Sequence, residues 1–416
     1  MTTAETFSQY VLPTYGRFPI IPEKAQGSYL WDSDGKRYLD FCTGIAVCSI
    51  GHCHPRLTAA IQKQAETLMH CSNLYQVPQQ AELAKLIVED FVKIPGKVFF
   101  SNSGAEANDG LIKLARRFGH FKTAPDGSAR GEVITFNKSF HGRTLGSMAA
   151  TGNPSIKEGF APLLEGFAHA DLNDIESVKA LISEKTCAVL LEPLQGEGGV
   201  NTVQPEFLRG LKQLCDEHDL LLMFDEVQAG FGRLGYDMAW RAIAPEIEPD
   251  AISWAKGIGG GFPIGAFFSS DRSVNDKGTT LSSLLGAKSH GSTYGGNPMA
   301  CAAAISVLEE IKESNLAENA TTQGEYITQQ VAGWDLAHVS HVKGSGLMLG
   351  IQLNADAFTL TEGQTPALVL CIALNEAGLL TVPAGAETLR LLPPLNVTKE
   401  EVDEALALIH ETLKSL

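Results

Sequence analysis

The chain has 416 residues, of which 32 are basic and 48 acidic, so its formal net charge is −16, and hydrophobic residues make up 44%. This composition excludes a disordered or collagen-like chain, and the longest apolar run, residues 367–374, is far shorter than the roughly twenty residues of a membrane-spanning helix. The acidic charge argues against nucleic acid as a partner, because that function needs a basic surface.

The N-terminal residues 1–12 contain no Lys or Arg and no long apolar core, so we predict neither a secretory signal nor a transit peptide. The eight cysteines are scattered and mostly lie in apolar runs, which indicates reduced thiols in the cytoplasm rather than a disulfide scaffold. Residues 48–54 crowd four Cys and His side chains together without a second knuckle. We interpret them as a turn before Pro55 and expect no metal site.

The first third of the chain mixes strand and helix signals. Residues 28–41 predict two strands around a turn at Asp34-Gly35, and residues 54–69 have apolar side chains at helical spacing. A short strand at 97–100 leads into Ser103-Gly104-Ala105-Glu106. Here Ser103 is a candidate N-cap and Glu106 stands at the capping-box position of the following helix.

Strands and helices then alternate up to residue 270, which predicts an α/β lobe. Most of these strands are apolar without alternation, as expected for a largely parallel sheet that is buried on both faces. The expected strands are 133–136, 187–191, 220–224, 251–254 and 264–269, and the expected helix among them is 206–218.

The last third of the chain predicts a smaller α+β lobe. A long helix begins at Pro298, strands are expected at 347–353 and 389–392, and a final helix begins after Thr398 with Glu401 completing a capping box. We therefore expect three segments: an N-terminal segment of residues 1–68, a large domain of residues 69–306, and a small C-terminal domain of residues 307–416.

Ionisable residues follow three of the predicted strands, and ligands of parallel sheets bind beyond the carboxyl ends of the strands. These residues are Glu192, Asp225 and Lys256. An acid and an amine at neighbouring strand ends could form a buried ion pair, or they could hold one cofactor between them. The backbone amides of Gly104 and Ala105 could reach a phosphate at a helix N-terminus, although an ordinary capped helix explains the same residues.

Seven motifs occur in one order along the chain: Gly51-His-Cys-His-Pro55, Asn102-Ser-Gly-Ala-Glu-Ala-Asn108, Phe140-His-Gly-Arg143, Glu192-Pro-Leu-Gln-Gly-Glu-Gly-Gly199, Phe224-Asp-Glu-Val-Gln228, Ala255-Lys-Gly-Ile-Gly-Gly-Gly-Phe-Pro263 and Gly291-Ser-Thr-Tyr-Gly-Gly-Asn-Pro298. Each motif is weak alone, but together they cover nearly the whole chain. The chain resembles the class III (ω-amino) aminotransferases, enzymes of fold type I that use pyridoxal 5′-phosphate. The resemblance implies an α/β fold, with a large domain around a mainly parallel sheet and a smaller α+β domain formed by the N- and C-terminal segments.

The resemblance also implies which residues contact the cofactor. Lys256 is expected to form a Schiff base with it and then to act as the base that moves a proton. Asp225 is expected to face the pyridine nitrogen and keep it protonated, so that the ring can accept electrons. Phe140 would stack on the ring, unless it is an ordinary core aromatic, and Gln228 would bind the 3-hydroxyl. The remaining expected contacts are Ser103, Gly104, Ala105, Val227 and, from the neighbouring subunit of a homodimer with shared active sites, Thr293.

Two arginines are expected to bind substrate carboxylates, because the guanidinium fork is bidentate. The resemblance implies that Arg143 holds the distant carboxylate of the amine donor and that Arg390 binds the α-carboxylate of glutamate. Glu197 would pair with Arg390 while the amine donor is bound. A structural Glu197–Arg390 salt bridge and a surface position for Arg143 are the alternatives. Tyr15 and, from across the interface, Ser292 complete the expected substrate contacts.

The expected substrate follows from three further features. The segments Tyr15-Gly-Arg17 and Arg390-Leu-Leu-Pro-Pro394 are similar to those of class members that act on N2-acetyl-L-ornithine. Ornithine aminotransferases carry a Tyr where this sequence has Ile45, and an apolar slot there favours an acylated donor. We therefore predict ping-pong transfer of the terminal amine of N2-acetyl-L-ornithine to 2-oxoglutarate, of the arginine-biosynthesis type. A succinylornithine or 4-aminobutyrate aminotransferase, an aminomutase and a non-catalytic binding protein are the alternatives.

Overall fold

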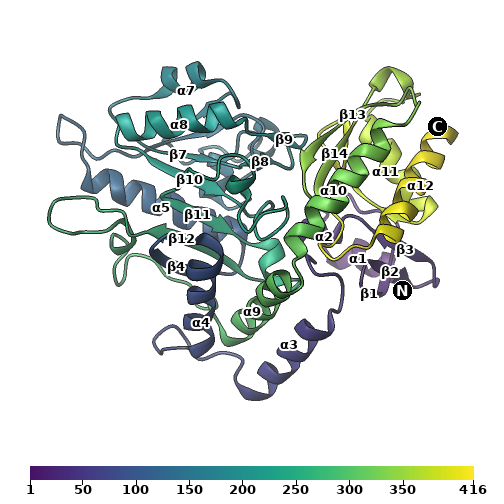
Figure 1. The fold of residues 1–416 in the computed structure, drawn as a ribbon, viewed down its shortest axis with the longest axis horizontal. Helices are drawn as coiled ribbons and strands as arrows, with labels where there is room; N and C mark the ends of the chain where they lie inside the picture. Colours follow the sequence, from purple (N-terminus) through teal and green to yellow (C-terminus); the bar gives the residue numbers. More distant parts are fainter.

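In the computed structural model, which describes residues 1–416, a seven-stranded sheet forms the centre of the larger group of elements, at the left of Figure 1. Its strands are ordered β4-β12-β11-β10-β7-β5-β6. Each pair of adjacent strands from β11 through β10, β7 and β5 to β6 is parallel, whereas β12 is antiparallel to both β11 and β4. The bounds are β4 Gly96–Ser101, β5 Glu132–Phe136, β6 Phe167–Ala170, β7 Thr186–Leu191, β10 Leu221–Asp225, β11 Ala251–Trp254 and β12 Gly265–Ser270. The predicted α/β fold with a mainly parallel sheet is confirmed.

Helices cover both faces of this sheet because alternate side chains of its buried strands point in opposite directions. On β10, Leu222 and Phe224 pack in the same cluster as the apolar side of α8 (Pro205–Glu217). Their neighbours Leu221 and Met223 pack instead with the apolar side of α5 (Gly104–Phe121). Figure 1 shows α8 and α7 (Ile175–Leu181) over one side of the sheet.

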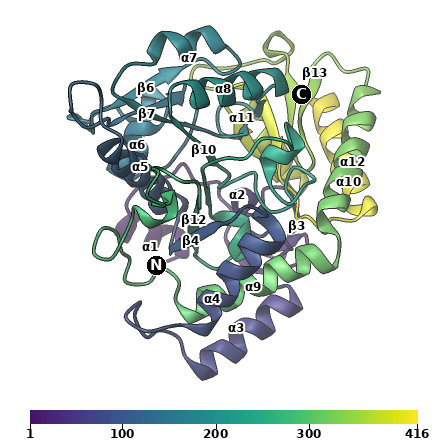
Figure 2. The same cartoon turned by 60° about the vertical axis from the view of Figure 1, so that its left-hand side comes forward.

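A second group of elements contains the C-terminal residues, at the right of Figure 1. Its antiparallel sheet has the order β13-β14-β17-β16, and α10, α11 and α12 accompany it. Figure 2 shows α12 beside α10, with which it is in contact. The bounds are α10 Leu316–Ala332, β13 Val339–Ser345, β14 Met348–Leu353, α11 Pro366–Ala377, β16 Val382–Ala384, β17 Thr388–Leu391 and α12 Lys399–Ser415. The predicted capping box of Thr398 and Glu401 is present at the start of α12.

The N-terminal segment joins this C-terminal group. A four-stranded sheet has the order β1-β2-β3-β15, so the C-terminal strand β15 (Leu379–Leu380) pairs with β3 (Arg37–Asp40). Tyr29 and Arg37 both hydrogen-bond to Glu404 of α12. The other elements of this segment are α1 Thr3–Tyr10, β1 Pro22–Gln26 and β2 Tyr29–Asp32. The expected domain limits at residues 68 and 306 stay predictions, and the second of them falls inside helix α9.

Four more helices link or border these groups. Helix α9 (Pro298–Glu313) packs against α3 (Pro55–Thr67) and α4 (Pro78–Leu86), at the bottom of Figure 1. The short helix α6 (Leu145–Ala150) contacts α5. The elements predicted from sequence are observed to within about two residues at each end. None of the helices is both long and apolar enough to span a membrane.

Candidate active site

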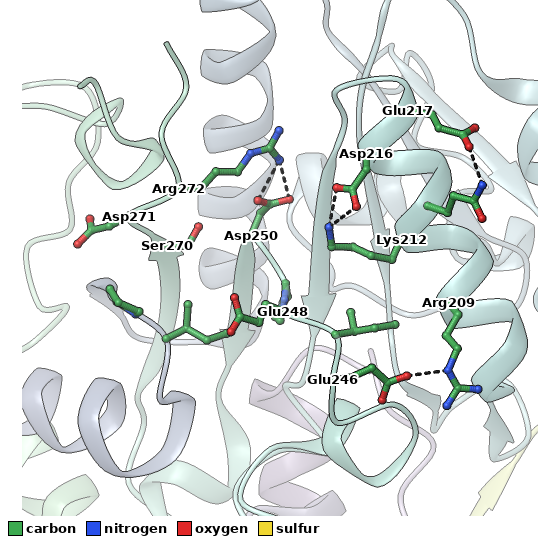
Figure 3. Close-up of a pocket in the computed structure, with 15 residues that line it drawn as sticks. Arg209, Lys212, Asp216, Glu217, Glu246, Glu248, Asp250, Ser270, Asp271 and Arg272 are labelled. Atoms are coloured by element: carbon green, nitrogen blue, oxygen red, sulfur yellow. Dashed lines mark hydrogen bonds and ion pairs between the residues drawn. The ribbon is translucent and has the colours of Figure 1, made fainter. Parts of the chain in front are cut away.

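Two hollows lie at opposite ends of the central sheet. The larger, a surface groove of about 880 Å³, lies near the amino end of β11, beside Asp250 and Arg272 (Figure 3). Its three cationic side chains all bond to carboxylates of its own walls, which indicates a structural ion-pair network. The pairs are Arg209–Glu246 at 2.6 Å, Lys212–Asp216 at 2.5 Å and Arg272–Asp250 at 3.0 Å. Ligands of parallel sheets bind at the other end, where the strands finish.

The second hollow lies at that carboxyl end, where β7, β10 and β11 finish beside the start of α5. It is a cavity of about 200 Å³ that contains Glu192, Asp225 and Lys256 together. The three strand-end residues singled out from sequence therefore share one site. The lining residues are Gly104, Ala105, Asn108, Phe140, His141, Gly142, Arg143, Glu192, Glu197, Asp225, Val227, Gln228 and Lys256.

Asp225, the last residue of β10, is buried and held by three donors. Its Oδ2 accepts hydrogen bonds from Asn108 Nδ2 at 2.7 Å and from His141 Nδ1 at 2.8 Å. Its Oδ1 accepts one from the backbone N–H of Val227 at 3.0 Å. Because Oδ2 already has two donors and Oδ1 has one, Oδ1 keeps acceptor capacity for a ligand in the cavity.

Lys256 begins a 3₁₀ turn, Lys256–Gly259, that follows β11. Its φ of 49° places it in the left-handed region, which is uncommon for a residue with a side chain. Ser49 Oγ donates to the Gly257 carbonyl at 2.6 Å and so fixes this turn. Burial in the cavity lowers the pKa of the Lys256 amine, which increases the fraction present as the neutral nucleophile.

Arg390 of β17 brings the C-terminal sheet into the site. Its guanidinium is 0% exposed, and Nη1 donates to Glu197 Oε1 at 2.7 Å and to Gln228 Oε1 at 2.8 Å. The Nε and Nη2 atoms are buried and have no hydrogen-bond partner. Burial by itself would raise the pKa of Glu197, but the charge and hydrogen bond of Arg390 outweigh this effect and lower it. The unpartnered N–H groups leave Arg390 with hydrogen-bonding capacity for an anionic ligand.

The loop between β5 and α6 supplies Phe140 and Arg143. The Arg143 guanidinium lies 5.4 Å from the centroid of the Phe140 ring, and Arg143 is exposed while it also lines the cavity. The backbone N–H of Phe140 donates to Glu192 Oε2 at 3.1 Å. Burial and the nearby charge of Asp225 raise the pKa of Glu192 well above its usual value.

The start of α5 exposes backbone amides to the same cavity. Ser103 is the N-cap, as predicted, and its hydroxyl accepts from the Glu106 N–H at 3.2 Å. The other half of the predicted capping box is wrong, because the Glu106 carboxylate binds the backbone N–H of Asn102 at 2.6 Å instead. The amides of Gly104 and Ala105 come first in the helix and have no intrahelical partner. A Cβ on Gly104 would stand 2.7 Å from Val227, so this close approach needs glycine.

Other expected residues lie elsewhere in the single chain. Tyr15 is 73% exposed on the N-terminal segment and does not line the cavity. Ser292 Oγ accepts from Asn102 Nδ2 at 3.0 Å, next to the site, and Thr293 is exposed. The roles of Ser292 and Thr293 at a partner subunit, and that of Tyr15, stay predictions. In the Cys48–His54 turn, His52 Nε2 bonds to Asp40 Oδ2 at 2.7 Å.

Sequence reasoning assigned no role to Asn108 and His141, although both lie in the recognised motifs. Both side chains contact the Asp225 carboxylate directly. One signal was available for Asn108, because it falls three and seven residues before Leu111 and Ala115 on the apolar side of α5. A polar residue on such a stripe is a candidate for a buried hydrogen-bond role.

The residues present fit pyridoxal phosphate. Lys256 provides an amine for an aldehyde, Asp225 an acceptor for a pyridine N–H, and the start of α5 free amides for a phosphate. The amine, the carboxylate and the helix start line one cavity, and Arg390 Nη1 donates to Glu197 and Gln228, which also line it. This combination of a mainly parallel α/β sheet and a strand-end lysine and aspartate defines a coenzyme-dependent transferase site.

Comparison with known proteins places the chain in one family. Residues 10–413 match the family described as aminotransferase class-III, and the chain belongs to it. Members of this family depend on pyridoxal phosphate, so the predicted cofactor, the fold type I architecture and the aminotransferase class are confirmed.

Two acetylornithine aminotransferases are each 43% identical to this chain. The protein of Caldanaerobacter subterraneus subsp. tengcongensis aligns over 98% of both chains. That of Gloeobacter violaceus aligns over 98% of this chain and 97% of its own.

Two solved structures are also similar. The ornithine aminotransferase of Toxoplasma gondii, whose structure shows partial occupancy of PLP at the active site, is 30% identical with a TM-score of 0.88 and covers 99% of this chain and 94% of its own. The N-acetylornithine aminotransferase of Stenotrophomonas maltophilia is 34% identical with a TM-score of 0.81 and covers 99% and 98%.

Proposed function

We propose that this aminotransferase moves the terminal amine of N2-acetyl-L-ornithine to 2-oxoglutarate, a reaction of the type used in arginine biosynthesis. The observation that carries the proposal is the hydrogen bonding of the Arg390 guanidinium. One of its nitrogens is bonded to Glu197, and the other two are buried without a partner. Such a group can bind a carboxylate close to the reacting centre or be neutralised by Glu197, as two substrates with differently placed carboxylates require.

Each half of the reaction would use the two arginines differently. With glutamate or 2-oxoglutarate, the carboxylate beside the reacting carbon would bind the Nε and Nη2 atoms of Arg390, which have no partner within the chain. With the acylated amine donor, Glu197 would keep Arg390 occupied, and the distant carboxylate would reach Arg143 at the exposed edge of the cavity. Ile45 is partly buried beside the apolar cluster that contains Leu194. An apolar wall there supports a donor whose α-nitrogen is acylated.

The cofactor roles that the resemblance implies are supported by the positions of most of these residues in the cavity. When bound, pyridoxal phosphate supplies an electrophilic carbon for the amine and a protonated ring that takes up electrons. Lys256 would bind that carbon and, when free, carry the proton. Asp225 would accept the pyridine N–H, Gln228 would bind the ring hydroxyl, and Phe140 would cover one ring face. The phosphate would be held by Ser103, Gly104, Ala105, with Val227 packed beside them, and by Thr293 of a second subunit.

A homodimer with shared sites is part of the proposal, because the resemblance implies that Thr293 and Ser292 reach the neighbouring subunit's site. The exposure of Thr293, which does not line the cavity of its own chain, supports this role. Sedimentation or light scattering should then give twice the 44.5 kDa of one chain.

We also propose a cytoplasmic location. The eight cysteines are all free thiols, which supports a reducing compartment.

One assay tests the substrate. Purified protein with pyridoxal phosphate is given 2-oxoglutarate and, in turn, acetylornithine, succinylornithine, ornithine or 4-aminobutyrate, and the glutamate formed is measured. Acetylornithine should have the highest kcat/KM. A large preference for another amine would overturn the substrate, and amine transfer that needs no oxo-acid acceptor would indicate an aminomutase.

A second experiment tests the chemistry. Borohydride reduction followed by peptide mass spectrometry should place the cofactor on Lys256. Lys256→Ala should bind the cofactor without turnover, whereas a change of the exposed Lys277, which does not line the cavity, should leave activity intact. Full activity of the Lys256→Ala protein would refute the role of this residue.

A further inference from the structure

A buried side-chain amide connects three parts of the site that are far apart in sequence. Asn108 stands in the second turn of α5 and is 1% exposed. Its Nδ2 donates to Asp225 Oδ2 of β10 and to the His141 carbonyl, both at 2.7 Å. Its Oδ1 accepts from Ser253 Oγ of β11 at 2.5 Å. Each N–H of the amide thus has one acceptor, and its carbonyl has one donor.

These partners allow only one orientation of the amide. If the group were rotated by 180°, its oxygen would face the Asp225 carboxylate and the His141 carbonyl, both of which only accept. The Ser253 hydroxyl donates to Oδ1 and holds the oxygen on the β11 side. Ser253 is 0% exposed and is the register partner of Asp225 in the β10–β11 pair, so the three groups have a fixed spacing.

The amide in turn fixes the carboxylate. Asp225 Oδ2 accepts from both Asn108 and His141, and these two donors define the plane of the carboxylate. With Oδ2 saturated, Oδ1 is the oxygen that can still accept from a ligand. Without the amide, one of the two donors to Oδ2 is lost, and rotation of the carboxylate about its Cβ–Cγ bond becomes easier.

Packing does not explain why this position is polar. Asn108 lies on the apolar side of α5, with Leu111 and Ala115 on the same stripe. An apolar residue would fill the space without the cost of burying an amide. The hydrogen bonds therefore indicate a role in the site.

We propose that Asn108 is a positioning residue for Asp225: its amide, oriented by Ser253, fixes the carboxylate so that Oδ1 faces the pyridine nitrogen of the cofactor. This inference rests on the proposed function of Asp225. Asn108 itself takes no part in proton transfer, and it acts through the direction in which Asp225 accepts a hydrogen bond. Two effects follow. The cofactor should bind more weakly when the amide is removed, and the bound ring should lose its fixed orientation.

The test compares Asn108→Leu and Ser253→Ala with wild type. Asn108→Leu removes both N–H groups of the amide and keeps a similar side-chain volume. Ser253→Ala removes only the hydrogen bond that orients the amide. The control is Thr135→Val, which removes the hydrogen bonds of an equally buried hydroxyl, to the Ala150 carbonyl and with His169 Nδ1, away from the cavity lining. The readouts are the Kd for pyridoxal phosphate, the visible circular dichroism of the bound cofactor, kcat and KM for the amine donor, and the melting temperature.

Asn108→Leu should raise the Kd for pyridoxal phosphate and lower kcat, each by roughly 10- to 100-fold, as expected for loss of a hydrogen bond to a charged group. It should also reduce the visible circular dichroism per bound cofactor and leave KM for the amine nearly unchanged. Ser253→Ala should give a shift of roughly 2- to 10-fold in the same quantities. Added to Asn108→Leu, it should have no further effect, because its only target is gone. Thr135→Val should lower the melting temperature alone.

An Asn108→Leu protein that folds, with unchanged Kd and circular dichroism, would overturn the proposal even if its melting temperature fell. If Asn108→Leu does not fold, Ser253→Ala decides, and wild-type cofactor binding by that variant would refute the inference. Failure of the proposed function gives a different result. In that case the wild-type protein itself would bind no cofactor or would transfer no amine.

Discussion

The pairing of Glu197 with Arg390 makes the choice between the two substrates sensitive to one carboxylate. Glu197→Gln keeps the size of the side chain and removes its charge. In the amine half of the reaction, the buried Arg390 guanidinium would then lack its neutralising partner. In the glutamate half, the α-carboxylate of the substrate would take that place, so the loss should not be felt. The ratio of kcat/KM for glutamate to kcat/KM for the amine donor should therefore rise.

The size of this change follows from the geometry. The Arg390 Nη1 to Glu197 Oε1 distance is 2.7 Å, at which Coulomb's law with an effective dielectric of 20 gives about 6 kcal/mol. This is an upper bound, because Glu197 is 34% exposed and its desolvation and screening reduce the net gain. A charge-assisted hydrogen bond contributes ~1.5–3 kcal/mol. The ratio should thus shift roughly 10- to 150-fold toward glutamate.

Stopped-flow measurement of each half-reaction, followed by the absorbance of the cofactor, provides this ratio directly. Glu246→Gln is a matched control, because it breaks an exposed ion pair with Arg209 at 2.6 Å in the remote groove and should leave the ratio unchanged. If Glu197→Gln slows both half-reactions equally, the pair is a structural salt bridge. That outcome would refute the reasoning.

Three further changes test other parts of the structure. The Asp40 carboxylate, 2.7 Å from the ring, raises the pKa of His52 to about 10, above its ordinary 6.5. This pair should therefore stabilise the fold fully below pH 6.5 and progressively less as the pH rises through 10. In urea unfolding, His52→Gln should lower the free energy of unfolding by ~1–3 kcal/mol at pH 6 but by little at pH 11. A Cβ on Gly265 would overlap the carbonyl of Ser103 at the start of α5, and one on Gly110 would overlap a core ring. Gly265→Ala and Gly110→Ala should each lower the stability by ~1–3 kcal/mol in thermal unfolding, but only Gly265→Ala should also weaken cofactor binding. Equal cofactor affinities of the two variants would contradict a phosphate site at this helix start. Arg143→Met should raise KM at least about tenfold for a donor with a distant carboxylate and leave a monoamine of equal length unaffected, since one charge-assisted bond is lost; the same KM change for both amines would exclude carboxylate binding there.

The central sheet could be predicted well because its strands are short apolar runs that end at charged residues. The run before Asp225 is buried along its whole length, and so is the run before Glu192. Burial on both faces removes the alternation that marks a half-buried strand, so the short length of these runs and the residues that end them carried the prediction. Strand β6 was not predicted, because three of its four residues are only partly buried and its sequence, Phe-Ala-His-Ala, has no clear strand preference.

The site could be predicted in part. The strand ends alone brought Asp225 and Lys256 to one edge of the sheet, because parallel strands end together. Arg390 could not be placed this way, since β17 belongs to another sheet and is distant in sequence. Its role came only from the resemblance to a family. Asn108 had one signal, its polar side chain on the apolar stripe of α5, but its bonds to Asp225 and Ser253 needed coordinates, because side-chain hydrogen bonds between different elements leave no pattern in a sequence.

The turn α2 (Thr43–Ala46) shows what local sequence preference cannot supply. Its four residues have φ values of 47°, 65°, 64° and 61°, so it is left-handed, although Thr43 and Ile45 are β-branched. Left-handed backbone costs roughly 1–2 kcal/mol for each residue with a side chain, so propensity argues against it. Tertiary contacts must outweigh this cost.

Those contacts come from separate parts of the chain. Asp40 Oδ1 of β3 accepts the backbone N–H of Thr43 at 2.7 Å, and Thr43 Oγ1 donates to the Leu392 carbonyl, just after β17, at 2.8 Å. On the other side, α2 packs against the turn that begins with Lys256. The strained turn therefore lies between the C-terminal sheet that carries Arg390 and the proposed nucleophile. Its shape depends on contacts with both neighbours at once, which is why no local preference of residues 43–46 predicts it.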